Sequence, residues 1–265
     1  MSFTRWLSNP LGLSPRSVSR RKTPAARPTF RPTLEALEDR WVPSTLTVLN
    51  NLDSGAGSLR AEIAAAHNSD TIVFASRLNG QTITLTSGEL LIRKNLTIAG
   101  PGAGPLTVTV SGNNTSRVFE VTKAGSVTVS GLTISNGVAN GVAPLGEGGG
   151  ILNHGTLTVS GSTLSGNSAG YGGTLNFAPG YGGGIYNYAG ALTVSGSTLS
   201  GNVAASSGGG IYNTISGTAT IKNSSSITGN TAPVGLGADV YNQGVLYLDI
   251  SSIIGILDGN PARPI

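Results

Sequence analysis

The side chains that could carry out chemistry are few in this sequence. It contains no cysteine and only two histidines, His67 and His154, which stand far apart. The absence of cysteine excludes thiol catalysis, cysteine-ligated zinc and disulfides. Neither histidine has the two or three clustered partners that a metal ion needs, so we interpret both as structural or solvated and expect no metal and no cofactor.

Carboxylates are sparse over the long stretch between residues 124 and 242, whose only charged side chains are Glu147, Lys222 and Asp239. Glycoside hydrolysis needs two carboxyl groups at a defined separation. Lyase chemistry on uronates needs a base, usually with Ca²⁺ held by several carboxylates. Neither pattern is present in this stretch, and we interpret Asp239 as a turn residue at the place of Gly209 or Gly183.

A denser set of charges precedes that stretch: Glu89, Arg93, Lys94, Arg117, Glu120 and Lys123. These residues could converge on one face of the fold. Our main prediction is a protein without catalysis, and the alternative is a polysaccharide-active enzyme, either a lyase or a glycoside hydrolase, that uses this set.

Tyrosines offer a different chemistry, which is binding. A tyrosine side chain combines a broad apolar ring with a hydroxyl group. If they line one face, the five candidates could contact carbohydrate or another protein: Tyr171, Tyr181, Tyr186, Tyr188 and Tyr212. The alternative is that they merely cover the edges of the fold.

These residues lie in repeats. The motif GGGIYN occurs at 182–187 and 208–213, as GGGILN at 148–153 and in degraded form at 237–242, while 157–167 recurs unchanged at 192–202. The positions of Ile151, Ile185, Ile211 and Val240 are 34, 26 and 29 residues apart. Such periods are typical of repeat folds. Irregular spacing favours a solenoid, in which a segment such as 170–180 can bulge outward at a turn.

Each repeat reads as short strands. Leu192 and Val194 alternate with Thr193 and Ser195, which is the period of a strand with one buried face. A Ser-Gly-Ser break and a second short strand follow. The sequence therefore predicts an all-β fold, a single-stranded parallel β-helix over residues 44–265 with three strands in each of about eight coils and the clearest repeats at 126–242.

Asparagines recur at two turns of the repeats. One row is Asn153, Asn187, Asn213 and Asn242, and the other is Asn136, Asn167, Asn202 and Asn230. Asparagine tolerates the positive φ of turns, and stacked amides can hydrogen bond along a fibre-like axis. We predict two structural ladders rather than a row of ligand-binding residues.

The first 43 residues are of a different kind. They carry eight basic and three acidic residues, a net charge of +5, whereas the other 222 carry eight and nine, a net charge of −1. The basic excess is thus in the tail, which argues against a nucleic-acid-binding body. The proline-rich tail is predicted to be disordered, and no stretch is long and apolar enough to span a membrane.

One helix is expected in the body, over residues 58–67. Ser58 can cap its free amides, and Leu59, Ile63 and Ala66 fall on one helix face. Laid over the first coil, such a helix would protect the open end of the solenoid.

Three motifs resemble those of bacterial extracellular proteins. Residues 34–40 (LEALEDR) resemble the LExLExR sorting or export segment of large surface proteins, and the alternative is a short helix-forming linker. Residues 53–63 (DSGAGSLRAEI) resemble the SLREAI start of extracellular β-helix proteins, with Ala61 and Glu62 exchanged and Gly57 in place of cysteine. The GGGI and LSGN phrases are similar to the GGAI and FxxN repeats of polymorphic outer membrane proteins.

The resemblance to extracellular β-helix proteins covers roughly residues 45–242. It implies a right-handed, pectin-lyase-like β-helix that is secreted or attached to the cell surface. It implies no particular activity. We therefore expect a structural or adhesive role, with polysaccharide or a cell-surface protein as partner and the oligomeric state open.

Overall fold

Short parallel strands, each stacked on the strand one coil earlier, build the body of this protein. The computed structural model describes residues 42–102, 104–140, 146–170, 179–233 and 235–265. Residues 42–265 form one compact unit. The segment 1–43 lies outside the described residues except for Val42 and Pro43, so its disorder and its role in export stay predictions.

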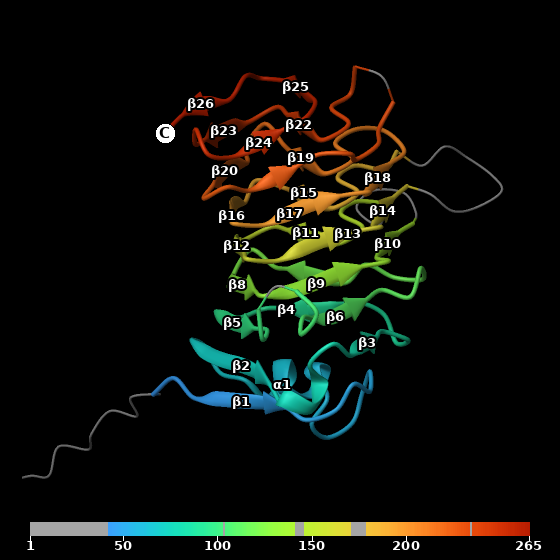
Figure 1. Cartoon of the computed structure of the whole chain (residues 1–265), viewed down its shortest axis with the longest axis vertical. Coiled ribbons are helices and arrows are strands. Elements are labelled where there is room, and N and C mark those ends of the chain that lie inside the picture. The colour runs from blue at the N-terminus through green and yellow to red at the C-terminus, as the bar shows by residue number, and fades with distance from the viewer. Residues whose placement is uncertain (1–41, 103, 141–145, 171–178, 234) are drawn as a thin grey trace, which may run out of the picture. The chain divides into compact units, whose positions relative to one another are not determined.

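Three long sheets and one short sheet run along the body (Figure 1). Sheet A contains β1 (Thr45–Val48), β2 (Asp70–Phe74), β5 (Leu96–Ala99), β8 (Ser126–Ser130), β12 (Thr156–Ser160), β16 (Ala191–Ser195), β20 (Thr218–Lys222), β23 (Val245–Leu248) and β26 (Arg263–Pro264). Sheet B contains β3 (Thr82–Thr84), β6 (Val108–Ser111), β9 (Leu132–Ser135), β13 (Thr163–Ser165), β17 (Thr198–Ser200), β21 (Ser226–Ile227) and β24 (Ile253–Ile254). Sheet C contains β4 (Leu90–Ile92), β7 (Phe119–Val121), β11 (Ile151–Asn153), β15 (Ile185–Asn187), β19 (Ile211–Asn213), β22 (Val240–Asn242) and β25 (Leu257–Gly259).

The register of sheet C matches the repeats read from the sequence. Ile151 pairs with Ile185, Ile185 with Ile211, and Ile211 with Val240, all in parallel. The predicted all-β fold, a parallel β-helix, is therefore confirmed. Gly170 and Gly180, the ends of the predicted bulge, lie against each other, and residues 171–178 between them lie outside the described residues.

The prediction of three strands per coil was wrong for the central coils. A fourth sheet, sheet D, contains β10 (Val138–Ala139), β14 (Ser168–Ala169) and β18 (Val203–Ala204). Thr231 extends it by one bridge to Val203. Its two-residue strands are too short to show a period in the sequence, which is why the alternation did not reveal them.

Inward side chains form apolar columns along the axis. In sheet A, Val129, Val159, Val194 and Ile221 follow one another in register, and each is at most 1% exposed. Strand neighbours lie about 4.8 Å apart, so these side chains fill a continuous core. The intervening threonines and serines point outward and are partly or fully exposed.

Two asparagine ladders replace part of this core. Asn153 donates to Asn187, Asn187 to Asn213, and Asn213 to Asn242, each at 2.7 Å between amide nitrogen and oxygen. All four side chains are buried. They continue the inward column of sheet C whose first members are Ile92 and Val121. Because each buried amide is bonded to the next coil, the ladder stabilises the stacking.

The second ladder differs from its prediction at both ends. Asn167 donates to Asn202 and Asn202 to Asn230, at 2.9 and 2.8 Å. Asn136 does not belong to it, because this residue is exposed and has a φ of 50°. The last acceptor is Asp239, whose carboxylate bonds Asn230 at 2.8 Å and the Ile256 amide at 2.8 Å.

Asp239 is therefore not a simple turn residue. The hydrogen bonds from Gly210 to Ala238 and from Ile211 to Asp239 align it with Gly210 rather than Gly209. Its side chain is 3% exposed. A carboxylate accepts but does not donate, which suits the end of a ladder whose members all donate in one direction.

A third ladder was not predicted. The hydroxyl of Ser162 accepts the Leu132 amide, and Ser197 and Ser225 accept the amides of Ser162 and Ser197 in turn. Ser162 and Ser197 follow the glycines of the Ser-Gly-Ser breaks, Ser225 ends the corresponding Asn-Ser-Ser turn, and all three are buried. The break is thus a turn in which each coil hydrogen bonds to the next.

The N-terminal end carries the predicted helix, α1 (Leu59–Ala65), beside β1 and β2 (Figure 1); a short 3₁₀ turn, η1 (Ser76–Leu78), follows β2. The Ser58 hydroxyl accepts the Ala61 amide, and Leu59 and Ile63 are buried, as expected. Arg60 fastens the helix by donating to the carbonyls of Gly88 and Glu89.

Asp53 completes this attachment. It pairs with Arg60 at 2.8 Å and also accepts hydrogen bonds from the amide and hydroxyl groups of Ser87. Burial disfavours the charged form, but the bonds from Ser87 and Arg60 outweigh it and lower the pKa of Asp53 to about 2.

We expect this attachment to weaken in acid. A lowered pKa stabilises the fold fully above the unfolded value of 3.8, and the contribution is lost as the pH falls toward about 2. The loss should be about 1 kcal/mol after solvent screening. Thermal unfolding of Asp53→Asn and wild type between pH 2 and pH 6 checks it. The variant should be less stable than wild type near pH 6 and equally stable near pH 2. A stability difference at pH 2 as large as the one at pH 6 would contradict the assignment.

Candidate functional site

The outward face of sheet C gathers most of the candidate residues. In register along this face stand Glu120, Leu152, Tyr186, Tyr212 and Tyr241. Each is the middle residue of its three-residue strand, so its side chain points away from the core. The face is charged toward the N-terminal coils and aromatic toward the C-terminal ones.

Arg117 is the centre of the charged part. It is 6% exposed, and its Nη1 contacts Glu89 at 2.5 Å and Glu120 at 3.6 Å. Its other nitrogens donate to the carbonyls of Glu147 and Gly148 in the next coil. A buried guanidinium needs such paired acceptors, so Arg117 joins three coils.

The carboxyl groups around Arg117 are held in an unusual state. Burial raises the pKa of Glu89, the Arg117 charge opposes this, and the neighbouring Glu120 carboxyl adds to it. Burial also raises the pKa of Glu147, again opposed by Arg117. Two carboxyl groups in contact cannot easily both be ionised.

The five predicted tyrosines do not form one open surface. Tyr186 and Tyr212 are only 6% and 8% exposed, because their rings stack on each other with centroids 5.3 Å apart. Tyr241 stacks on Tyr212 at 5.3 Å, and Tyr181 packs against Tyr212 at 4.9 Å. Burial raises the pKa of Tyr212 to about 12. Tyr171 lies outside the described residues.

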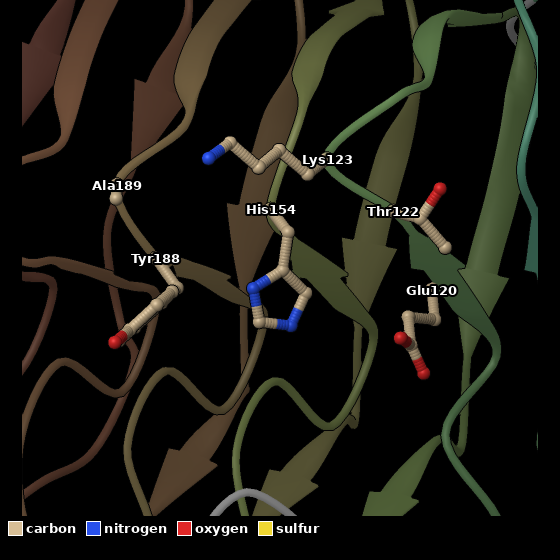
Figure 2. Close-up of a pocket in the computed structure, with 6 residues that line it drawn as sticks. All are labelled: Glu120, Thr122, Lys123, His154, Tyr188 and Ala189. Atoms are coloured by element: carbon tan, nitrogen blue, oxygen red, sulfur yellow. The ribbon is translucent and has the colours of Figure 1, made fainter.

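Tyr188 is the exposed member of the set. Half of its surface is open, and its ring meets the His154 ring edge-on at 5.2 Å. Together with Glu120, Thr122, Lys123 and Ala189, these two rings line a shallow pocket of about 230 Å³. Figure 2 shows His154 between Tyr188 and Glu120, with Lys123 reaching toward Ala189.

The pocket offers several hydrogen-bonding groups. Burial and the Arg117 charge lower the pKa of His154, so its imidazole is neutral at neutral pH and can both donate and accept. Among the described residues, Lys123 has no hydrogen-bond or ion-pair partner, and its side chain is exposed. Glu120 brings a carboxylate that Arg117 holds in place.

Some of the predicted charged set does not reach this site. Lys94 donates to the carbonyls of Ala64 and Ala66 at the end of α1, and the exposed Arg93 does not line the pocket. His67, at the other end of the body, lies 3.8 Å from Asp70. Sequence reasoning missed the involvement of Glu147, although its distance of 30 residues from Arg117 is about one coil.

Across the described part of the chain, no cluster of three or more acidic or histidine side chains is placed to hold a metal ion. That part also contains no helix with the length and apolar character needed to cross a membrane. Comparisons with protein-family models, with curated proteins and with solved structures found no match to this chain. The candidate site is therefore judged on its own geometry.

Proposed function

We propose that this protein is a binding protein of the cell exterior that holds polysaccharide on the outward face of sheet C and does not cleave it. The observation that carries the proposal is the pocket in which the half-exposed Tyr188 ring stands beside His154, Lys123 and Glu120. The amphipathic ring can pack on the apolar face of a sugar. The three polar side chains can bond its hydroxyl groups.

The size of the pocket supports a polymer rather than a small free ligand. Pockets for drug-sized ligands measure roughly 300–1,000 Å³, and this one holds about 230 Å³. It has room for one sugar ring, and the partly exposed Tyr181 and Tyr241 lie further along the same face. A chain of sugars could extend over them.

The exterior location rests on the resemblance of residues 34–40 to a sorting segment and of residues 53–63 to the start of extracellular β-helix proteins. A polar, glycine-rich solenoid held by internal amide ladders suits a structural or adhesive role. A cell-surface protein is the other partner that the sequence suggests.

Hydrolysis of the bound polymer is the second candidate, because Glu89 and Glu120 bring two carboxyl groups together beside the pocket. Retaining glycosidases separate theirs by about 5–5.5 Å and inverting ones by about 6.5–9.5 Å. Here both groups pair with the same nitrogen of the buried Arg117. Carboxyl groups held by one guanidinium are not free to attack a sugar or to pass it a proton, which favours binding.

The test is a titration of the full chain with a panel of neutral, acidic and amino polysaccharides. We expect Tyr188→Ala to weaken binding about tenfold, since a lost ring contact is worth roughly 1–1.5 kcal/mol. Tyr247→Ala is the matched control, because Tyr247 stands on sheet A. Equal affinity of the Tyr188→Ala variant and wild type, or no binding to any polymer, would refute the proposal. Release of reducing ends would establish the second candidate instead.

A further inference from the structure

The outward face of sheet A is a regular array of hydroxyl groups. On β8, β12 and β16 the outward positions read Ser126-Thr128-Ser130, Thr156-Thr158-Ser160 and Ala191-Thr193-Ser195. The central column continues in register on neighbouring strands through Thr71, Thr97 and Thr220. We call these residues the threonine face. The column ends at Tyr247 on β23, next to Thr220. The pocket around Tyr188 lies beside sheet C, so the threonine face is separate from the polysaccharide site.

The hydroxyl groups of the central column have no partner within the described residues. None of the six threonines makes a side-chain hydrogen bond there, whereas the buried serines of the third ladder are all bonded. Each threonine of this column on β8, β12, β16 and β20 is partly buried between its neighbours. A β-branched side chain so confined has few rotamers. The array therefore presents its hydroxyl and methyl groups in a fixed order.

The coil spacing of this array is rigid. Two asparagine ladders and one serine ladder connect successive coils inside the same part of the body. The register of β8, β12 and β16 is unbroken over all five residue pairs.

That repeat distance is close to one found in solid water. Hydrogen-bonded oxygens lie about 2.75 Å apart, and in a tetrahedral network two oxygens bonded to the same third oxygen are then about 4.5 Å apart. Neighbouring strands are about 4.8 Å apart. Over the three intervals from β8 to β20 the accumulated offset is about 0.9 Å, which is small beside the repeat.

The chemistry of the face also fits an ordered water lattice better than other partners. Its outward positions from β8 to β16 carry no charge and no aromatic ring. Protein partners are usually anchored by buried aromatic or arginine side chains, and flexible sugar chains lose entropy when they are ordered. A rigid water lattice loses little entropy on binding and can form hydrogen bonds with many equivalent hydroxyl groups at once.

We infer that the threonine face binds ice, with the hydroxyl and methyl groups of Thr128, Thr158 and Thr193 matched to water positions in the crystal surface. The role is independent of polysaccharide binding, because it uses a different sheet.

The experiment measures inhibition of ice recrystallisation and thermal hysteresis by the full chain. Wild type should inhibit crystal growth, and Thr158→Tyr, which raises a bulky ring in the middle of the face, should lower the inhibition about tenfold at equal concentration. Thr115→Tyr is the control, because Thr115 is exposed in a turn outside sheet A. It should keep full inhibition.

Two further arms keep the inference falsifiable. Thr158→Val retains the shape of the side chain and removes its hydroxyl group. It should also lower the inhibition of crystal growth, and it tests the threonine face even if Thr158→Tyr fails to fold. Crystalline cellulose and chitin are added as solid phases. Crystal growth unaffected by wild type, equal inhibition by Thr158→Val and wild type, or binding to the solid polysaccharides that Thr158→Tyr abolishes would each overturn the ice assignment.

Discussion

Replacement of Asn187 by alanine is expected to cost about 3–5 kcal/mol of folding free energy and to lower the melting temperature by roughly 10 °C. Asn187 is fully buried in the middle of its ladder. Its amide nitrogen donates to Asn213 at 2.7 Å and to the Gly190 carbonyl at 3.0 Å. Its oxygen accepts from Asn153 at 2.7 Å.

The reason for so large an effect is that alanine removes one side chain but leaves several partners without theirs. A buried polar group without a hydrogen bond costs about 1–3 kcal/mol, and the Asn153 amide and the Asn213 oxygen both lose their strongest contact. A cavity adds to this cost. Circular dichroism against temperature measures the change.

Asn136→Gly is the control for this measurement. Asn136 is exposed and has the positive φ that glycine adopts freely, so this variant should melt within about 0.5 kcal/mol of wild type. If Asn187→Ala were equally mild, the ladder would be incidental to stability and the amides could be exchanged for apolar residues.

The repeats and the alternation of apolar residues were enough to predict the parallel stacking. Leu192 and Val194 are inward because a strand shows each face at every second residue. The recurrence of isoleucine at 151, 185 and 211 fixed the register of sheet C, which the pairing confirms. These features are local in the sequence and repeat from coil to coil.

The candidate site could be predicted only in part, since it depends on which residues lie one coil apart. Glu89, Arg117 and Glu147 are 28 and 30 residues apart, and the coils vary in length, so sequence spacing does not show that they meet. The burial of Tyr186 and Tyr212 could not be predicted from the sequence either. Both occupy outward positions and are covered mainly by other tyrosines.

The glycine motif shows a further limit of sequence reasoning. Its last copy, at 237–242, was interpreted only as a degraded repeat, although its departures from glycine have structural reasons. Its first glycine, at positions 148, 182, 208 and 237, always has a positive φ between 61° and 67°. The second glycine is needed for a different reason, which is close contact. A Cβ on Gly183 would collide with the carbonyl oxygens of Val203 and Gly209.

The last copy has alanine at that second position, and sheet D explains it. Gly183 faces Val203 of β18, and Gly209 faces Thr231, the last residue that sheet D includes among the described residues. Beyond Thr231 no strand of sheet D crosses the motif in the described part of the chain. Ala238 is accordingly partly exposed, and its Cβ is accommodated.

Gly183→Ala is therefore expected to destabilise the protein by about 3 kcal/mol, the upper part of the range for overpacking, and to lower the melting temperature by about 6–12 °C. The two colliding atoms belong to the backbone of the next coil, so they cannot turn aside as a side chain could. The matched control, Ala238→Gly, should change stability by less than about 1 kcal/mol. Equal melting temperatures for Gly183→Ala and wild type would mean that the coils can separate enough to admit a methyl group, and the rigid coil spacing on which the threonine face depends would then be wrong as well.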